Sequence, residues 1–149
     1  MKILMVCLGN ICRSPLAEGI LAYKTQHLDV TVESAGTAGY HIGKLPDERS
    51  IEIANKYDID ISNQKARQFS RADFDEFNII YAMDTNNFAH LTSLAKNQNE
   101  RDKIRMILNE INSESFDSVP DPYYGGDNGF HIVYNMLDKA CNKIITQIE

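Results

Sequence analysis

Two short runs of consecutive apolar residues constrain the fold more than any other feature of this sequence. Residues 3–6 read Ile-Leu-Met-Val, and residues 79–81 read Ile-Ile-Tyr. A strand that is apolar on both faces must be covered on both sides, which is typical of parallel sheets. Segments with apolar residues at helical spacing lie between such strands. The pattern therefore predicts an α/β fold of three layers, with helices on both faces of a doubly wound parallel sheet.

The expected elements alternate along the chain. We expect strands at Lys2–Val6, Val30–Ser34 and Phe77–Ala82. The segment 104–108 fits a strand or a helix equally well. We expect helices after Ser14-Pro15 with Ser14 as N-cap, from Pro46 to about Tyr57, after Asp84 as N-cap, and over the apolar face from Phe130 to Ile148. No repeat or linker interrupts the pattern, so we expect one domain over residues 1–149.

Charge and cysteine content narrow the function classes. The net charge is −6, and the acidic second half argues against a nucleic-acid-binding surface. No segment approaches the roughly 20 apolar residues that span a bilayer, and residues 3–6 are too short for a signal peptide. Three cysteines, an odd number, fit a reducing compartment. We expect a cytoplasmic protein with neither nucleic acid nor membrane as partner.

The loop after the first strand predicts an anion cradle. Its sequence is Cys7-Leu8-Gly9-Asn10-Ile11-Cys12-Arg13-Ser14-Pro15. Gly9 and Asn10 readily adopt left-handed backbone angles, so they allow the loop to curl and aim successive N–H groups inward. Arg13 can offer two parallel donors to phosphoryl oxygens, and a helix N-terminus adds partial positive charge.

The same cradle favours a thiolate at Cys7, which stands at the carboxyl end of the first strand. Alone, a cysteine at this position would more often be a small buried apolar residue. The spacing to Arg13 and the adjacent Ser14, whose hydroxyl can donate to the thiolate, reverse that interpretation. We predict that Cys7 is the nucleophile in the hydrolysis of a phosphate monoester. The loop lacks the glycine and lysine pattern of nucleotide-binding loops.

Such a reaction also needs a proton donor for the leaving group. Asp121 stands between Pro120 and Pro122, which present its side chain from a rigid loop, and Tyr123 and Tyr124 follow. Two adjacent tyrosines can wall a pocket for an aromatic ring. The same residue types are common in ordinary turns, so Asp121 is the candidate general acid only because the cysteine loop is also present.

Together, the segment Val6–Pro15 and the later Asp121-Pro122-Tyr123-Tyr124 resemble the low-molecular-weight protein tyrosine phosphatases over the whole chain. The resemblance implies a four-stranded parallel sheet with helices on both faces. It implies phosphotyrosine-containing proteins as substrates, a cysteinyl-phosphate on Cys7, and a protein that is a monomer or weak dimer. It implies neither metal nor cofactor.

The resemblance also assigns supporting roles. The phosphate-binding loop would comprise Leu8, Gly9, Asn10, Ile11, Cys12 and Ser14. Asn10 and Ser34 would brace it through hydrogen bonds, Tyr40 would face Tyr123 and Tyr124 across the pocket, and Cys12 would protect Cys7 by forming a disulfide. Many eukaryotic family members carry, where this chain has Gln64, a histidine that supports the loop network. We therefore expect the support of the loop at this position to be weaker or supplied differently here. His41 could tune the choice of substrate, although a lone histidine in a loop is more often solvated.

Three alternatives remain open. An arsenate reductase of the same fold would need further cysteines to relay electrons, and Cys141 alone fits poorly. A non-catalytic phosphotyrosine-binding module would normally lack the nucleophile or the acid. A metal site on Cys7 and Cys12 would need a shorter cysteine spacing than the sequence shows.

Overall fold

The structure is a computed structural model that describes residues 1–113, 115–122 and 128–149. Within these ranges four strands form one parallel sheet in the order β2-β1-β3-β4. The strands are β1 (Lys2–Cys7), β2 (Thr31–Gly36), β3 (Ile79–Ala82) and β4 (Ile104–Met106). Cys7 pairs with Gly36 on one side of β1, and Val6 pairs with Ala82 on the other. The four-stranded parallel sheet that the sequence and the resemblance predict is confirmed.

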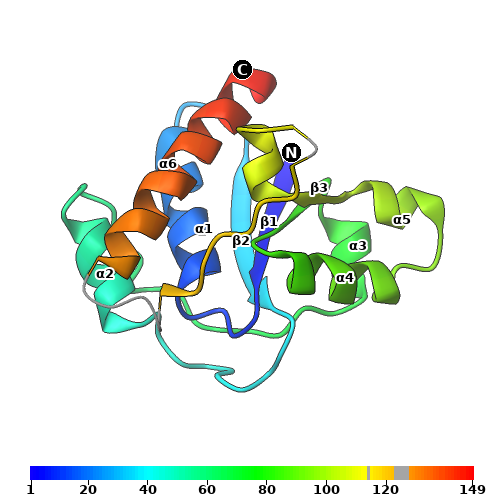
Figure 1. Cartoon of the computed structure of the whole chain (residues 1–149), viewed down its shortest axis with the longest axis horizontal. Helices are drawn as coiled ribbons and strands as arrows, with labels where there is room; N and C mark the ends of the chain where they lie inside the picture. Colours follow the sequence, from blue (N-terminus) through cyan, green and yellow to red (C-terminus); the bar gives the residue numbers. More distant parts are fainter. Residues whose placement is uncertain (114, 123–127) are drawn as a thin grey trace.

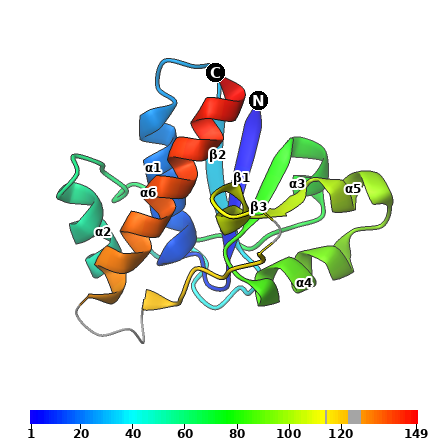
Figure 2. The same ribbon diagram turned by 45° about the horizontal axis from the view of Figure 1, so that its top comes forward.

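Helices cover both faces of the sheet, as predicted (Figures 1 and 2). They are α1 (Arg13–Lys24), α2 (Glu48–Asn55), α3 (Ala72–Glu76), α4 (Thr85–Leu94), α5 (Gln98–Asp102) and α6 (Gly129–Ile148), with a 3₁₀ turn, η1, at Ile107–Glu110. In both views α1, α2 and α6 lie on one side of the sheet, and α3 and α4 lie on the other. No helix in the described part of the chain is long and apolar enough to cross a membrane.

The continuous apolar run in β1 explains the two cores. Ile3 and Met5 pack with α1 and α6, while Leu4 and Val6 pack with α3 and α4, and all four side chains are fully buried. Full burial of such a side chain contributes roughly 1.5–3 kcal/mol each. The strand is thus the shared wall of both cores, which fixes its position at the centre of the sheet.

Helix starts were predicted with mixed success. Asp84 does cap α4, because its Oδ1 accepts a hydrogen bond of 2.7 Å from the backbone N–H of Asn87. Ser14 does not cap α1, so that prediction was wrong. The helix already begins at Arg13, and the Ser14 hydroxyl contacts Cys7 and Asn10 instead. A buried thiol and a carboxamide compete successfully for a hydroxyl that sequence rules assign to the helix end.

The carboxyl ends of β1 and β2 position the loop that follows Cys7. The backbone N–H of Thr37 donates to the Cys7 carbonyl, and that of Ala38 donates to the Leu8 carbonyl, both at 2.9 Å. A Cβ atom at Gly36 would lie 2.7 Å from the Leu8 carbonyl oxygen. Real Cβ atoms do not approach so closely, so the glycine allows the two backbones to touch.

We predict that Gly36→Ala destabilises the fold by about 1–3 kcal/mol, because the added methyl group must displace backbone atoms. Urea denaturation followed by circular dichroism measures the change. Gly39→Ala is the matched control, since a Cβ there would meet the ends of the Gln68 and Ile42 side chains, which can move aside. Equal stability losses in the two variants would contradict the backbone-contact explanation.

Candidate active site

The loop between β1 and α1 is curled and anchored at both ends. Asn10 adopts a left-handed conformation with φ of 58°, which asparagine tolerates better than most residues because its short side chain can hydrogen-bond locally. Farther along, the Ile11 carbonyl accepts a hydrogen bond of 2.8 Å from the backbone N–H of Asp47, just before α2. The curl that the Gly-Asn pair predicts is therefore present, with Asn10 as the left-handed residue.

Cys7 lies at the base of this loop with only 3% of its surface exposed. Its Sγ is 3.0 Å from the Ser14 hydroxyl, and the backbone N–H of Asn10 donates to it at 3.3 Å. A backbone N–H group and a hydroxyl group therefore both reach the sulfur atom. The geometry matches the expected environment of a nucleophilic cysteine.

The Asn10 carboxamide connects three separate segments. Its Nδ2 donates to Ser14 Oγ at 2.8 Å and to Ser34 Oγ at 2.9 Å. Its Oδ1 accepts from the backbone N–H of Arg67 at 3.0 Å, so the orientation of the amide is fixed. The bracing of the loop by Asn10 and Ser34 is present in this geometry.

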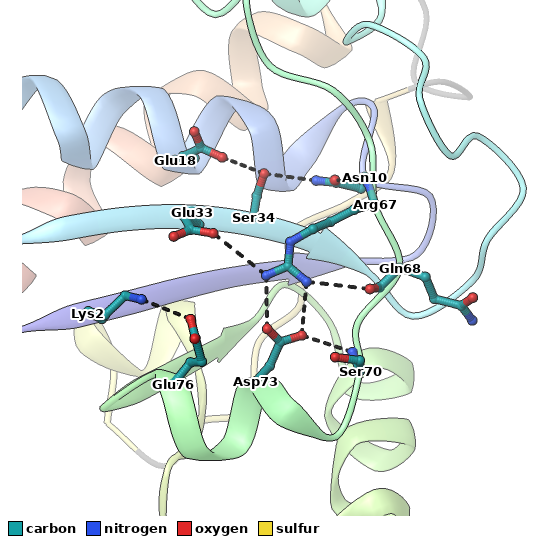
Figure 3. A network of polar contacts seen from close by, with 10 residues as sticks. All are labelled: Lys2, Asn10, Glu18, Glu33, Ser34, Arg67, Gln68, Ser70, Asp73 and Glu76. Carbon is teal, nitrogen blue, oxygen red and sulfur yellow. Dashed lines mark hydrogen bonds and ion pairs between the residues drawn. The ribbon is translucent and has the colours of Figure 1, made fainter.

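Charged residues hold the outer side of this network (Figure 3). The Ser34 hydroxyl donates to Glu18 Oε1 at 2.6 Å. Partial burial raises the pKa of Glu18 to about 7. The Arg67 guanidinium donates to both carboxylate oxygens of Asp73 at 3.0 Å, which fixes the segment whose backbone binds Asn10. Gln64 donates through Nε2 to the Pro15 carbonyl at 3.0 Å.

Arg13 is held by groups that the sequence analysis did not connect with it. Its guanidinium is almost fully buried, with Nη1 2.7 Å from Asp84 Oδ2 and 3.0 Å from the Val119 carbonyl oxygen. Asp84 therefore has two roles, because its other oxygen caps α4. Its place directly beyond β3, at the same sheet edge as Cys7, was the signal available in the sequence.

A cavity of about 370 Å³ opens over the loop. It is lined by Cys7, Leu8, Gly9, Ile11, Cys12, Arg13, Tyr40, His41 and Asp121. The structure thus brings together Cys7, Arg13 and Asp121, three residues that the sequence analysis selected from distant segments. Tyr123 and Tyr124, the other predicted pocket residues, lie outside the described residues.

Tyr40 and His41 form one wall of the cavity. Tyr40 is 74% exposed, and its ring meets the His41 ring edge-on, with 6.4 Å between centroids. His41 is half-buried and lines the cavity, so it is not simply a solvated loop residue. It packs over the loop so closely that a Cβ atom on Gly9 would lie 2.9 Å from its Cδ2.

The other two cysteines have different surroundings. Burial, followed by the negative charges of Asp47 and Cys7, raises the pKa of Cys12 to about 12, so Cys12 keeps its proton at neutral pH. Cys141 is fully buried on α6, and burial raises the pKa of its thiol too. Among residues 1–113, 115–122 and 128–149, no group of three or more His, Cys, Asp or Glu side chains could hold a metal ion.

The sequence model of the family described as low molecular weight phosphotyrosine protein phosphatase matches residues 2–149. The chain belongs to this family. It is 38% identical to the low molecular weight protein-tyrosine-phosphatase YfkJ of Bacillus subtilis over 99% of this chain and 96% of the relative. Membership makes this phosphatase an enzyme that acts on phosphoproteins.

Solved structures agree with this assignment. A protein tyrosine phosphatase from Entamoeba histolytica, crystallised with Hepes in its active site, superposes with a TM-score of 0.91 at 36% identity, covering 99% of this chain and 96% of that one. The Drosophila arginine phosphatase superposes with a TM-score of 0.92 at 30% identity, covering 100% of this chain and 98% of that one. The phosphatase thus shares its whole fold with both proteins.

We predict that Asp84→Asn lowers kcat/KM on an aryl phosphate by on the order of 10- to 100-fold, because the Arg13 guanidinium loses the charge that orients it. Asparagine is a good N-cap, so α4 should remain intact. Steady-state kinetics and a thermal melt measure the two effects. Asp47→Asn is the matched control, since Asp47 caps α2 in the same way but does not bind Arg13. An unchanged kcat/KM in Asp84→Asn would show that Arg13 does not depend on this carboxylate.

Proposed function

We propose that the phosphatase hydrolyses phosphotyrosine in proteins, and small aryl phosphates, through a cysteinyl-phosphate intermediate, with residues 1–149 acting as one catalytic domain. One observation carries the proposal. A single cavity at the carboxyl edge of the sheet is lined by the thiol of Cys7, by Arg13 and by the carboxyl group of Asp121. These are the nucleophile, the phosphate ligand and the proton donor that such a reaction requires.

In the first step the Cys7 thiolate attacks phosphorus, and an S–P bond forms as the bond from phosphorus to the tyrosyl oxygen breaks. Arg13 and the N–H groups of residues 8–12 hold the three equatorial oxygens, whose charge they stabilise without reorganising. Asp121 gives its proton to the leaving phenolate. The Ser14 hydroxyl, 3.0 Å from Sγ, stabilises the thiolate before attack.

In the second step the S–P bond is hydrolysed. Asp121, now ionised, takes a proton from a water molecule, which attacks phosphorus from the side that the phenol has left. The S–P bond breaks, and the electron pair returns to Cys7 as the thiolate. Inorganic phosphate is released and Asp121 is again protonated, so the cycle closes without a cofactor.

The cavity wall supports an aryl ester as substrate. Tyr40 and His41 line the cavity, and an aromatic pair formed with a substrate ring would contribute roughly 0.5–1.5 kcal/mol beyond the area that it buries. Phosphoserine has no ring to occupy this wall. We therefore infer a preference for phosphotyrosine over phosphoserine.

Two other reactions need to be separated from this one. Arsenate reduction requires a relay of thiols, and the third cysteine, Cys141, is fully buried in the core on α6. Phosphoarginine is a second possible substrate to test, because the superposed Drosophila protein is named an arginine phosphatase. An aromatic wall can contact a phenyl ring or stack on a guanidinium group, so experiment has to separate these two substrates.

Cys12 lines the same cavity as Cys7, which supports a role for its thiol in protecting the nucleophile. If Cys7 is oxidised to its sulfenic acid, attack by Cys12 forms a disulfide and releases water. The charge on Cys7 is one of the causes that raise the pKa of Cys12, so oxidation of Cys7 makes Cys12 easier to ionise. All three cysteines are free thiols, which fits the reducing cytoplasm as the compartment.

We predict that Cys7→Ser abolishes turnover, because an un-ionised hydroxyl is a far weaker nucleophile than a thiolate. The experiment offers phosphotyrosine and phosphoserine peptides, phosphoarginine, and arsenate with a thiol reductant to the wild-type protein and the variant. The expected result is phosphate release from phosphotyrosine by the wild type alone. Faster release from phosphoarginine, or thiol consumption driven by arsenate, would replace the proposed substrate.

We predict that Asp121→Ala slows aryl phosphates with poor leaving groups by about 10²–10⁴-fold, the usual contribution of a general acid. Esters of acidic phenols, which leave without a proton, should lose much less. Plotting kcat/KM against the pKa of the leaving phenol measures the difference. Asp117→Ala, on an exposed carboxylate nearby in the sequence, is the control. Equal losses for good and poor leaving groups would exclude Asp121 as the acid.

A further inference from the structure

A continuous series of hydrogen bonds links Cys7 to the carboxyl group of Glu18 on α1. Cys7 Sγ contacts Ser14 Oγ at 3.0 Å, and Asn10 Nδ2 bridges Ser14 and Ser34 at 2.8 and 2.9 Å. Ser34 Oγ then reaches Glu18 Oε1 at 2.6 Å. Figure 3 shows the outer half of this chain, with Ser34 between Glu18 and Asn10.

The orientation of the Asn10 amide determines the direction of every hydrogen bond in this series. The Arg67 backbone N–H donates to Asn10 Oδ1, so the two protons of Asn10 Nδ2 point to the two serine oxygens. Each serine hydroxyl accepts there and has one proton left to donate. Ser14 gives its proton to the sulfur of Cys7, and Ser34 gives its proton to the Glu18 carboxylate. In this arrangement both ends of the hydrogen-bond chain are acceptors, the sulfur of Cys7 and the carboxylate of Glu18.

Glu18 is placed so that its charge can change near neutral pH. Its pKa is raised to about 7, mainly by burial and further by the negative charge of Glu33, while the Ser34 hydrogen bond and Arg67 act in the opposite direction. Glu18 is half-buried and lines a cleft that is open to solvent. The other titratable groups of that cleft are Tyr23, Asp58 and Asp60.

We propose that Glu18 is a positioning residue for the Cys7 loop, whose ionised carboxylate directs the hydrogen-bond chain through Ser34 and Asn10 and whose protonation reverses the Glu18–Ser34 bond. A neutral carboxyl group donates to Ser34 Oγ instead of accepting from it. The serine oxygen then receives two donors, its own proton loses its acceptor, and its hold on Asn10 weakens. The effect on catalysis rests on the proposed function, but the coupling between Glu18 and Asn10 does not.

NMR titration of the full chain between pH 5 and pH 9 tests this coupling without any substrate. Carbon-13 labelling reports the ionisation of the Glu18 carboxyl group, and nitrogen-15 labelling reports the Asn10 side-chain amide. Both signals should titrate with one midpoint near pH 7. In Glu18→Gln, which keeps the size of the side chain but cannot ionise, the Asn10 titration should disappear while the backbone spectrum stays folded.

Two further variants make the test specific. Glu33→Gln removes a like charge beside Glu18, so the shared midpoint should move to lower pH. Glu76→Gln removes a carboxylate that pairs with Lys2 and lies outside the hydrogen-bond series from Cys7 to Glu18. In this variant the titration midpoint should stay unchanged. A Glu18 midpoint near 4.5, or an Asn10 titration that survives in Glu18→Gln, would overturn the proposal.

Kinetics then connect the coupling to turnover. The pH profile of kcat/KM for an aryl phosphate should lose one inflection near pH 7 in Glu18→Gln and keep it in Glu76→Gln. An Asn10 titration without catalytic turnover would uphold the coupling and refute the proposed function. Turnover with an unchanged pH profile in Glu18→Gln would refute the positioning role alone.

Discussion

The conformation of Asn10 is the constraint on which the site depends. A left-handed residue in mid-loop is costly for most side chains, and three hydrogen bonds from one carboxamide compensate here. Those bonds tie the loop to α1, to β2 and to the segment before α3. The loop can therefore stay curled without a phosphate inside it, so binding energy need not be spent on curling the loop.

The parallel sheet supplies the rest of the geometry. Because its strands end at one edge, Cys7, Ser34 and Asp84 lie near one another although they belong to different parts of the chain. At this edge the single carboxylate of Asp84 both caps α4 and orients Arg13. The phosphate ligand is thus positioned by a residue that also begins a helix.

Local patterns were enough to predict the fold and to select Cys7, Arg13 and Asp121, which the structure places around one cavity, but not to predict their partners. Continuous apolar runs predicted the parallel sheet, and the loop motif predicted Cys7 and Arg13 because each residue type has a direct chemical role there. The hydrogen bonds of Glu18 and Arg67 depend on contacts between segments, which sequence spacing does not encode. For Ser14 the expected contact with Cys7 is present, but the expected N-cap role is not, because the hydroxyl is already engaged by Cys7 and Asn10.

The ionised carboxylate of Glu18, which the proposed loop arrangement needs, lowers the stability of the folded chain. Its pKa in the folded chain is about 7, above the ordinary value of 4.5, so the folded state binds its proton more tightly than the unfolded state does. The stability from this proton is fully present below pH 4.5 and is lost as the pH rises through 7. The ionised form, which directs the chain toward Cys7, is therefore the less stable one. A carboxyl group in this position makes sense for catalysis rather than for folding, since an apolar side chain of similar size on α1 would avoid the desolvation.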